Sequence, residues 1–203
     1  MAIATNVVAN GSSTTAGLNA HNSYITLYKV NHAAITFNNL AIGGEVYTDL
    51  IARESAINAL RLVGALNVYW LQPFSNDYPI SGGLNARCFS AMRAHVARMK
   101  LARWTIVLVN QLPRSLSQYN EYRNTYQNPS IASMVSEGRA DFLMNWGNDP
   151  VIGTDAAGCD TSIIGDGIHP TQWTHDYGYA NYVVPIMARI RPPGSAATDQ
   201  ASY

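Results

Sequence analysis

The chain has 203 residues, enough for one domain to bury a core without disulfide or metal staples. Charged residues make up only 13% of it, about half the usual share, and its 13 basic side chains balance its 13 acidic ones. A net charge of zero leaves no basic surplus for nucleic acid or an anionic membrane surface, so neither is expected as a partner.

Predicted strands and helices alternate along the chain. In chain order the sequence predicts strand Thr5–Asn10, helix Ser23–Asn31, strand Ala34–Asn38, helix Asp49–Ala65, strand Val68–Leu71, helix Leu84–Leu101, strand Trp104–Asn110, helices Gln118–Tyr126 and Ile131–Glu137, strand Ala140–Asn145 and helix Gln172–Ile190. Asp49 is expected to cap its helix, and Pro129 to break the helical region around it. Gly178 and Pro185 are expected to interrupt the last helix.

Strands that alternate with helices predict a parallel sheet covered on both faces. We expect an α/β fold of the flavodoxin-like kind, a three-layer α/β/α sandwich with about five parallel strands. A single domain is expected over residues 1–190, followed by a flexible tail of linker composition, 191–203. In such sheets sites form at the carboxyl ends of the strands, so the segments that follow the strands are the candidates for chemistry.

The sequence says less about compartment and assembly. No stretch approaches the roughly 18 apolar residues of a membrane span, and no signal peptide is visible after Met1. The low charge and the many Asn, Ser, Thr and Tyr side chains are typical of secreted or particle-associated proteins, which favours an extracellular location. Cys88 and Cys159 match no metal-binding spacing and are either two thiols or one disulfide. The oligomeric state stays open.

The loop before the last predicted helix, Gly165 to Thr171, reads GDGIHPT and contains an acid–histidine pair. Asp166 and His169 are three residues apart, and Pro170 biases His169 away from helical geometry. A carboxylate beside an imidazole fixes its tautomer and stabilises its charged form, which suits proton transfer near neutral pH. Taken alone, the pattern is also typical of a loop-capping aspartate beside a surface histidine.

A serine follows the first buried strand, in the glycine-flanked turn Asn10 to Gly17. Ser13 would be presented there to the carboxyl edge of the sheet. A hydroxyl becomes a good nucleophile when a base takes its proton, and His169 would be that base. The alternative is that Ser12 and Ser13 are turn and helix-capping residues.

Two further loops offer donors for the oxyanion of an ester-cleavage intermediate, and one such donor is worth about 3–4 kcal/mol. Gly43 and Gly44 carry no side chain that would block their backbone N–H groups. Asn76 offers a side-chain amide. Each of these residues is also an ordinary turn residue, so only their combination with the serine and the acid–histidine pair indicates catalysis.

Taken together, the segments GSSTTAG, NLAIGG, SND and DGIHP resemble the SGNH hydrolases, also called the GDSL esterase/lipase family. That family places Ser, Gly, Asn and His on four blocks in this order, and the resemblance spans residues 11–170. It implies Ser13 as nucleophile and Asp166 and His169 as the rest of the triad. It also implies an oxyanion hole made by the N–H of Ser13 together with Gly44 and Asn76, and a structural role for the neighbouring Asp77.

The chain departs from the family pattern at two positions. Ser12 stands where the family usually has Asp, so that Ser12 competes with Ser13 as the nucleophile; the register of Gly11 and Gly17 favours Ser13. Phe74 stands where the third block usually has Gly, which would put a bulky ring beside Asn76 and shape an acyl pocket. The common α/β-hydrolase pattern G-x-S-x-G fits less well, because Thr15 occupies the place of its last glycine.

Other residues offer weaker alternatives. A metal site built from Asp166, His169, His175 and Asp176 is conceivable, but the chain has no H-E-x-x-H motif and no cysteine ligand group. No metal and no cofactor are therefore expected. Three aromatic residues flank the motif loops and would either line the cleft or pack in the core: Tyr78, Trp173 and Tyr177. Three further histidines have no evident partner: His21, His32 and His95.

The sequence therefore predicts a serine hydrolase of short-chain carboxylic esters that works through an acyl-enzyme. Its expected substrate is a small ester or an acetylated carbohydrate. An O-acetyl esterase of carbohydrates is the main alternative, and an acyltransferase would use the same residues. A non-catalytic carbohydrate-binding or structural module on this fold is a further alternative, because a fold does not determine a function.

Overall fold

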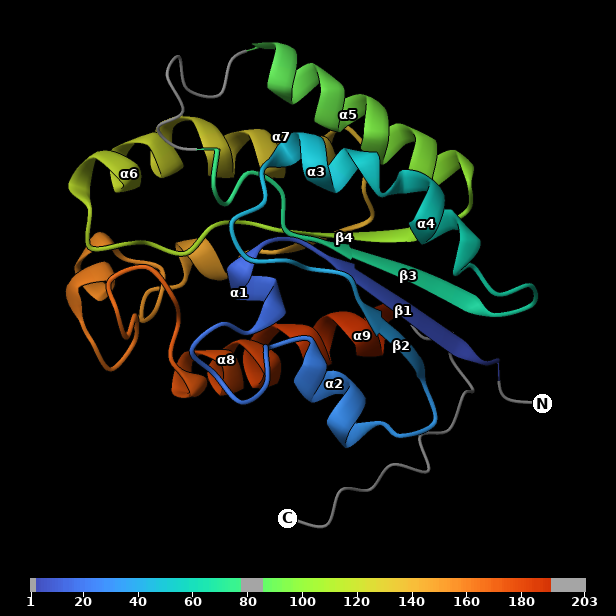
Figure 1. Ribbon diagram of the computed structural model, residues 1–203, viewed down its shortest axis with the longest axis horizontal. Coiled ribbons are helices and arrows are strands. Elements are labelled where there is room, and N and C mark those ends of the chain that lie inside the picture. The colour runs from blue at the N-terminus through green and yellow to red at the C-terminus, as the bar shows by residue number, and fades with distance from the viewer. Residues whose placement is uncertain (1–2, 78–85, 191–203) are drawn as a thin grey trace.

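The computed structural model describes residues 3–77 and 86–190. Five parallel strands form one sheet, in the spatial order β2-β1-β3-β4-β5, between two layers of helices (Figure 1). The predicted three-layer α/β/α sandwich is confirmed. The strands are β1 (Thr5–Asn10), β2 (Thr36–Asn39), β3 (Leu66–Leu71), β4 (Thr105–Val109) and β5 (Phe142–Met144). The predicted tail, 191–203, lies outside the described residues.

The helices divide between the two faces of the sheet (Figure 1). One face is covered by α3 (Tyr47–Ala52), α4 (Glu54–Ala59), α5 (Ala86–Leu101), α6 (Ser117–Tyr122) and α7 (Asn128–Ser136). The other is covered by α2 (Thr26–Asn31), α8 (Gln172–Gly178) and α9 (Val184–Ile190). A short helix, α1 (Ser13–Ala16), follows β1. Within the described part of the chain, no helix is long and apolar enough to cross a bilayer.

Strand side chains alternate between two hydrophobic cores, one on each face of the sheet. Val7 and Val68 pack with Tyr24, which lies just before α2, in one core, whereas Val8 and Tyr69 belong to the other. All six residues of β1 are buried. Because both faces are covered, the central strands β3 (LNVYWL) and β4 (TIVLV) are nearly continuous apolar runs rather than alternating ones.

The helix predicted over Asp49–Ala65 is divided and ends early. It forms α3 and α4, and its last helical residue is Ala59. The Asn67 side chain accepts from the N–H of Leu62 and donates to the Leu62 carbonyl, so these backbone groups bond to a side chain instead of continuing a helix. Asp49 is not the N-cap as predicted; it lies in the first turn of α3 and accepts from the N–H of Val46 at 3.1 Å.

Two predicted helix breaks are wrong. A π-helical turn, η1 (Arg123–Gln127), joins α6 to α7, and the helix runs on through Pro129 in its first turn. The π turn shifts the hydrogen-bond ladder just before proline, which has no N–H to contribute. A second π turn, η4 (Tyr179–Val183), likewise joins α8 to α9.

Gly178, which was expected to interrupt the last helix, instead lets α8 pack closely. A Cβ at this position would lie 2.9 Å from the Trp146 ring. Trp146 lies in the 3₁₀ turn η2 (Trp146–Asn148), and a second such turn is η3 (Asp155–Cys159). Cys88 is buried and Cys159 exposed, and the two sulfur atoms are not bonded to each other. Of the two alternatives for the cysteines, the structure therefore has two thiols.

Candidate active site

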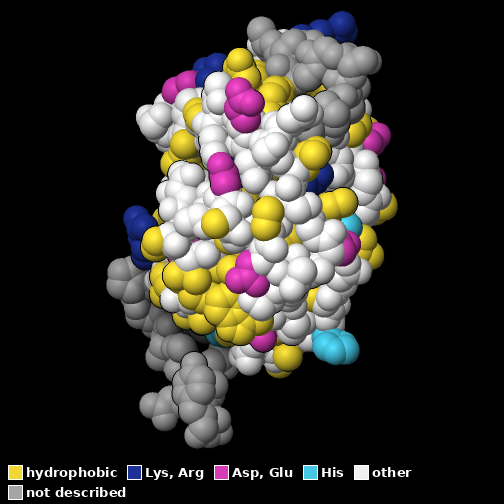
Figure 2. Space-filling view, turned by 90° about the vertical axis from the view of Figure 1, so that its left-hand side faces the viewer, with side chains coloured by type: hydrophobic (Ala, Val, Ile, Leu, Met, Phe, Trp, Pro, Cys, Tyr) yellow, Lys and Arg dark blue, Asp and Glu magenta, His cyan; other side chains and the backbone are white. Residues whose placement is uncertain are grey.

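The residues singled out by the sequence lie at the edge of the sheet where the strands end. Figure 2 looks at the molecule from that end: neutral polar side chains and backbone cover most of it, charged side chains are scattered, and hydrophobic side chains cluster towards the lower edge. The low overall charge of the chain is thus visible on the face where a parallel sheet places its ligands.

Ser13 is the first residue of α1 and is 4% exposed. The four-residue helix ends at Gly17, whose left-handed φ of 84° turns the chain and whose N–H donates to the Ser13 carbonyl at 3.0 Å. N–H groups in the first turn of a helix have no partner inside the helix, so the N–H of Ser13 is positioned to donate outward. Ser12 precedes the helix, and its buried hydroxyl has no hydrogen-bond partner among the described residues.

The glycine-containing loop after β2 lies against Ser13. A Cβ on Gly43 would be 3.7 Å from the Cβ of Ser13. The N–H of Ile42 donates to the Gly11 carbonyl, and the Asn39 side chain donates to the Thr15 carbonyl at 2.9 Å. Gly44 follows with φ of 84°, a conformation that favours glycine, and the space around its missing Cβ is open.

Asn76 connects this loop to the loop after β3. Its Nδ2 donates to the carbonyl of Glu45 at 2.9 Å, directly after Gly44, and its Oδ1 accepts from Arg114 at 3.4 Å. One of its two amide hydrogens is thereby committed and the orientation of the amide is fixed. The next residue, Asp77, is buried and accepts from the N–H of Tyr47 at the start of α3. Burial raises the pKa of Asp77 to about 6.

The backbone conformation at Phe74 explains why glycine is favoured at this position. Its φ is 69°, in the left-handed region, which costs a residue with a Cβ about 1–2 kcal/mol. The ring is fully buried and packs edge-on against Phe89 at 5.2 Å in the core under α5. The prediction that it shapes a substrate pocket is therefore wrong, because the ring points into the core.

Two glutamine side chains hold the backbone before Asn76. Gln111 donates to the carbonyl of Pro73, and Gln127 of the π turn donates to the carbonyl of Phe74 at 2.8 Å. Both glutamines are buried. They fix the strained turn that presents Asn76, and sequence reasoning missed them because each partner lies far away along the chain.

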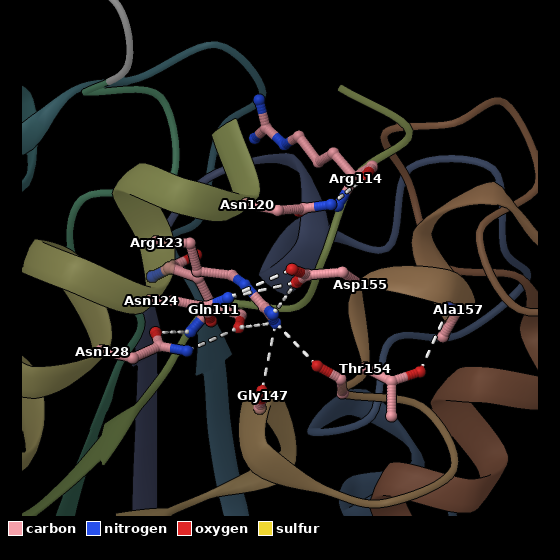
Figure 3. Close-up of polar contacts among 11 residues, drawn as sticks. Gln111, Arg114, Asn120, Arg123, Asn124, Asn128, Gly147, Thr154, Asp155 and Ala157 are labelled. Carbon is pink, nitrogen blue, oxygen red and sulfur yellow. Dashed lines mark hydrogen bonds and ion pairs between the residues drawn. The ribbon is translucent and has the colours of Figure 1, made fainter. Parts of the chain in front are cut away.

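A buried arginine anchors the surroundings of Gln111 (Figure 3). Arg123, 1% exposed, donates to the carbonyls of Gln111, Gly147 and Gly153 and pairs with Asp155 at 2.7 Å. Burial lowers the pKa of Arg123, and Asp155 acts in the opposite direction. This network joins the end of β4 to the long loop that follows β5.

The loop from Gly165 to Pro170 holds Asp166 and His169 together. The Nδ1 atom of His169 lies 2.7 Å from Oδ2 of Asp166, while Oδ1 accepts from the N–H groups of Ile168 and His169 at 2.9 and 2.7 Å. Burial alone would raise the pKa of Asp166, but these hydrogen bonds and the imidazole outweigh it and hold the pKa below its usual range. With Nδ1 occupied, Nε2 of His169 is left as the basic atom.

Two residues that the sequence analysis missed join the chain after α1 to this pair and to α8, the helix that follows it. Asn19, three residues beyond the end of α1, donates to Oδ2 of Asp166 at 2.8 Å and itself has φ of 65°. Gln172, the first residue of α8, accepts from the N–H groups of His21 and Asn22 at 2.8 and 3.0 Å. The structure describes both Ser13 and His169, and no hydrogen bond joins the Ser13 hydroxyl to the His169 ring. In the absence of substrate, catalytic hydrogen bonds are often long.

Comparison of the sequence with protein-family models and with curated proteins finds no match. Solved structures do match. TesA superposes with a TM-score of 0.73 at 16% identity, covering 91% of this chain and 99% of TesA. A lipolytic G-D-S-L family protein from Veillonella parvula superposes with a TM-score of 0.70 at 11% identity, covering 92% of this chain and all of the other.

The chain has the fold of the GDSL, or SGNH, hydrolases. The resemblance predicted from four short segments is confirmed at the level of the fold.

A third structural neighbour is an acetylxylan esterase. Axe2, an acetylxylan esterase from Geobacillus stearothermophilus, superposes with a TM-score of 0.67 at 16% identity over 90% of this chain and 96% of its own. Two catalytic mutants of Axe2 have been solved, with an aspartate and a histidine three positions apart each replaced by alanine. Asp166 and His169 have the same spacing.

The remaining histidines of this GDSL-fold chain have structural surroundings. His95 is bound to Glu54 and Tyr69, and buried His175 accepts the N–H of Tyr24 on Nδ1 at 3.1 Å. No group of three or more His, Cys, Asp or Glu side chains in the described ranges could hold a metal ion. His32 stacks on Tyr28, and His21 is exposed.

The aromatic residues near the motif loops differ in their surroundings. Tyr78 lies outside the described residues. Trp173 is half exposed in the first turn of α8, and its ring lies 5.4 Å from the Tyr177 ring in a tilted arrangement. The Tyr177 hydroxyl donates to Asp149, so that ring has a structural partner.

Proposed function

We propose that the chain is a carboxylic ester hydrolase that cleaves short-chain esters with Ser13 as nucleophile. The observation that supports this most is the Asp166–His169 pair, tied through Asn19 to the segment that carries Ser13. A free serine, a positioned imidazole and convergent N–H donors are the parts that acyl transfer needs.

In the proposed first step, Oγ of Ser13 attacks the ester carbonyl and Nε2 of His169 takes the hydroxyl proton. Asp166 keeps Nδ1 protonated and stabilises the imidazolium that forms. The carbonyl oxygen becomes negative and accepts from the N–H groups of Ser13 and Gly44 and from the second amide hydrogen of Asn76. The bond to the alcohol then breaks, and His169 gives the leaving oxygen its proton.

In the second step, water attacks the acyl-serine while His169 takes a proton from it. The acid is released and the serine recovers its proton. No cofactor enters either step. The Gly44 and Asn76 donors are expected to strengthen their hydrogen bonds as negative charge develops, which lowers the barrier rather than only binding the ester.

The test is hydrolysis of p-nitrophenyl acetate, butyrate and octanoate by the wild type, Ser13→Ala and Ser12→Ala. The wild type is expected to favour the two shorter esters. Ser13→Ala should lose a factor of about 10³ or more in kcat/KM, whereas Ser12→Ala should keep most of its activity. Activity that survives in Ser13→Ala and falls in Ser12→Ala would move the nucleophile by one residue.

A carbohydrate O-acetyl esterase is the second candidate, and the similarity to the acetylxylan esterase Axe2 favours it. Both candidates use the same chemistry and differ in the alcohol that leaves. The comparison of acetylated xylo-oligosaccharides with p-nitrophenyl acetate decides between them: a higher kcat/KM on the sugar supports the deacetylase. A chain that hydrolyses neither would be a binding module on this fold.

A further inference from the structure

A cavity of about 250 Å³ lies beside Asp166, between two segments of the chain. One wall is the segment from Arg114 to Tyr119 and the other is Asp166 to Ile168. Ser115 joins the walls, since its N–H donates to the Gly167 carbonyl at 2.9 Å and its hydroxyl donates to the same oxygen at 3.2 Å. The cavity is thus built by two loops that hold each other.

Arg114 is presented rigidly at this cavity. The Asn120 side chain accepts from its N–H at 2.9 Å and donates to its carbonyl at 2.7 Å, as Figure 3 shows, and the arginine side chain extends away from the Arg123 network. Its guanidinium lies over the Tyr119 ring at 4.3 Å. An arginine stacked in this way keeps the N–H groups on its edge free for planar recognition.

Among the described residues, the Arg114 guanidinium donates hydrogen bonds only through its Nη2 atom. Its Nη2 donates to the Ser75 carbonyl at 2.8 Å and reaches Oδ1 of Asn76 at 3.4 Å, which places the charge next to the candidate oxyanion hole. Among the described residues it pairs with no carboxylate, whereas Arg53, which is also partly buried, pairs with Glu45 and the fully buried Arg123 pairs with Asp155. A half-buried cation without a counter-ion favours an anionic ligand.

Asp166 also lines the cavity but does not satisfy this cation. Its Oδ1 accepts two N–H groups, and its Oδ2 is held by Asn19 and His169. The rest of the wall is apolar, with Leu116 and Ile168 each about half exposed to the opening. The cavity therefore combines a mainly hydrophobic lining with the guanidinium of Arg114, at the end near Asn76, and with the carboxylate of Asp166, whose two oxygens already accept hydrogen bonds within the protein.

We propose that this cavity is a specificity subsite for a carboxylate on the ester substrate, with Arg114 as its receptor. The inference rests on the proposed esterase function. The substrate class is an ester with an anionic group near the scissile bond, either on the alcohol, as in an acetylated acidic sugar, or on the acyl part, as in a half-ester of a dicarboxylic acid. A fork of two N–H groups matches the carboxylate geometry.

The test compares charged and neutral substrates of nearly equal shape. On the alcohol side these are 4-acetoxybenzoate and 4-acetoxybenzamide; on the acyl side they are mono-4-nitrophenyl adipate and its methyl ester. The kcat/KM of the charged ester should exceed that of its neutral partner by about tenfold in at least one pair. Arg114→Gln should abolish this ratio and Arg114→Lys should keep part of it, because the charge stays but the fork is lost.

Arg189→Gln is the matched control. Arg189 also lies over an aromatic ring, Phe142, at 5.3 Å, but at the opposite end of the sheet, at the start of β5. It should leave the ratio unchanged. Because Arg114 also contacts Asn76, Arg114→Gln is expected to slow the hydrolysis of neutral esters too. Dividing the kcat/KM of the charged ester by that of its neutral partner removes this general effect. Equal values for charged and neutral esters, or a ratio that survives Arg114→Gln, would overturn the proposal.

Direct binding separates this proposal from the esterase assignment. Calorimetry on Ser13→Ala should detect 4-acetoxybenzoate more tightly than 4-acetoxybenzamide, and the difference should vanish in Ser13→Ala/Arg114→Gln. If the wild type cleaves neutral esters but the variants bind both compounds alike, only the subsite fails. If the wild type cleaves no ester but the carboxylate binds through Arg114, the esterase function fails and the subsite stands.

Discussion

Two histidines in this molecule contact a carboxylate through Nδ1, and they differ in what surrounds the other nitrogen. His95 of α5 lies 2.8 Å from Glu54, and His169 lies 2.7 Å from Asp166. Nε2 of His95 is bound to the Tyr69 hydroxyl at 3.1 Å, and the side chain is fully buried. The His169 side chain is 15% exposed, and its Nε2 has no hydrogen-bond partner among the described residues.

A contact between a carboxylate and a histidine is therefore not enough to make a catalytic pair. His95 is enclosed between helix and sheet, and burial lowers its pKa even though Glu54 acts in the opposite direction. It completes a closed network that also includes Arg98. His169 lies on a loop at the carboxyl edge of the sheet, and a hydrogen bond from Asn19 to Asp166 joins that loop to the serine segment. An open Nε2 is what a proton shuttle needs.

The largest expected effect is the loss of activity on replacing His169, with the replacement of His95 as the comparison. His169→Ala should lower kcat/KM for p-nitrophenyl acetate by a factor of about 10³ or more. His95→Gln should leave kcat nearly unchanged but lower the melting temperature, because the Glu54 and Tyr69 contacts are weakened inside the protein. Steady-state kinetics and thermal unfolding on both variants measure this. A large kcat loss in His95→Gln, with His169→Ala still active, would reverse the roles.

A smaller effect is expected where the His169 loop depends on a glycine. Gly167 has φ of 78°, and a Cβ there would collide with Ser115 Oγ. Gly138 has φ of 71° but nothing within 4 Å of its Cβ position. Gly167→Ala should therefore displace the Asp166 loop and lower kcat/KM by about tenfold or more, whereas Gly138→Ala should cost only about 1 kcal/mol of stability. Equal kinetics in the two variants would mean that the loop tolerates the displacement.

The smallest expected effect concerns pH and a third histidine, His175, which has no carboxylate partner. Burial lowers its pKa to about 4. The unfolded chain binds a proton at this residue below about pH 6.5, while the folded protein does not until about pH 4. Its contribution to stability is therefore present above pH 6.5 and is lost as the pH falls, by about 2 kcal/mol between pH 7 and 5.

Urea unfolding at several pH values measures this contribution. His175→Gln should flatten the pH dependence of the free energy of unfolding between pH 7 and 5. His21→Gln, at an exposed position, is the control and should keep the wild-type slope. A slope unchanged by His175→Gln would show that other groups take up the protons.

The fold could be predicted from the sequence because both faces of the sheet are buried. A strand buried on both faces consists of consecutive apolar residues, as in WTIVLVN. It also located Asp166 and His169, since both lie in one short loop. Glu54 and His95 are 41 residues apart, so their pairing was invisible. Asn19 was missed for the same reason, because its partner Asp166 lies 147 residues further on.

Helix interruptions were the least predictable feature. Pro129 is a strong break signal, yet the π turn of Arg123–Gln127 carries the helix across it. The side chains of that turn, Arg123 and Gln127, bond to carbonyls of other loops, so tertiary contacts decide the local geometry. Phe74 is similar: its left-handed backbone is held by glutamines and by a buried ring, and no local pattern marks it.

The most direct test of the proposed catalytic unit is labelling with a fluorophosphonate, followed by intact-mass and peptide mass spectrometry. One adduct is expected, on the peptide that contains Ser13; it should be absent in Ser13→Ala, strongly slowed in His169→Ala and retained in His95→Gln. An adduct on another serine, or labelling that does not depend on His169, would contradict the claim that Ser13 and the Asp166–His169 pair form one catalytic unit.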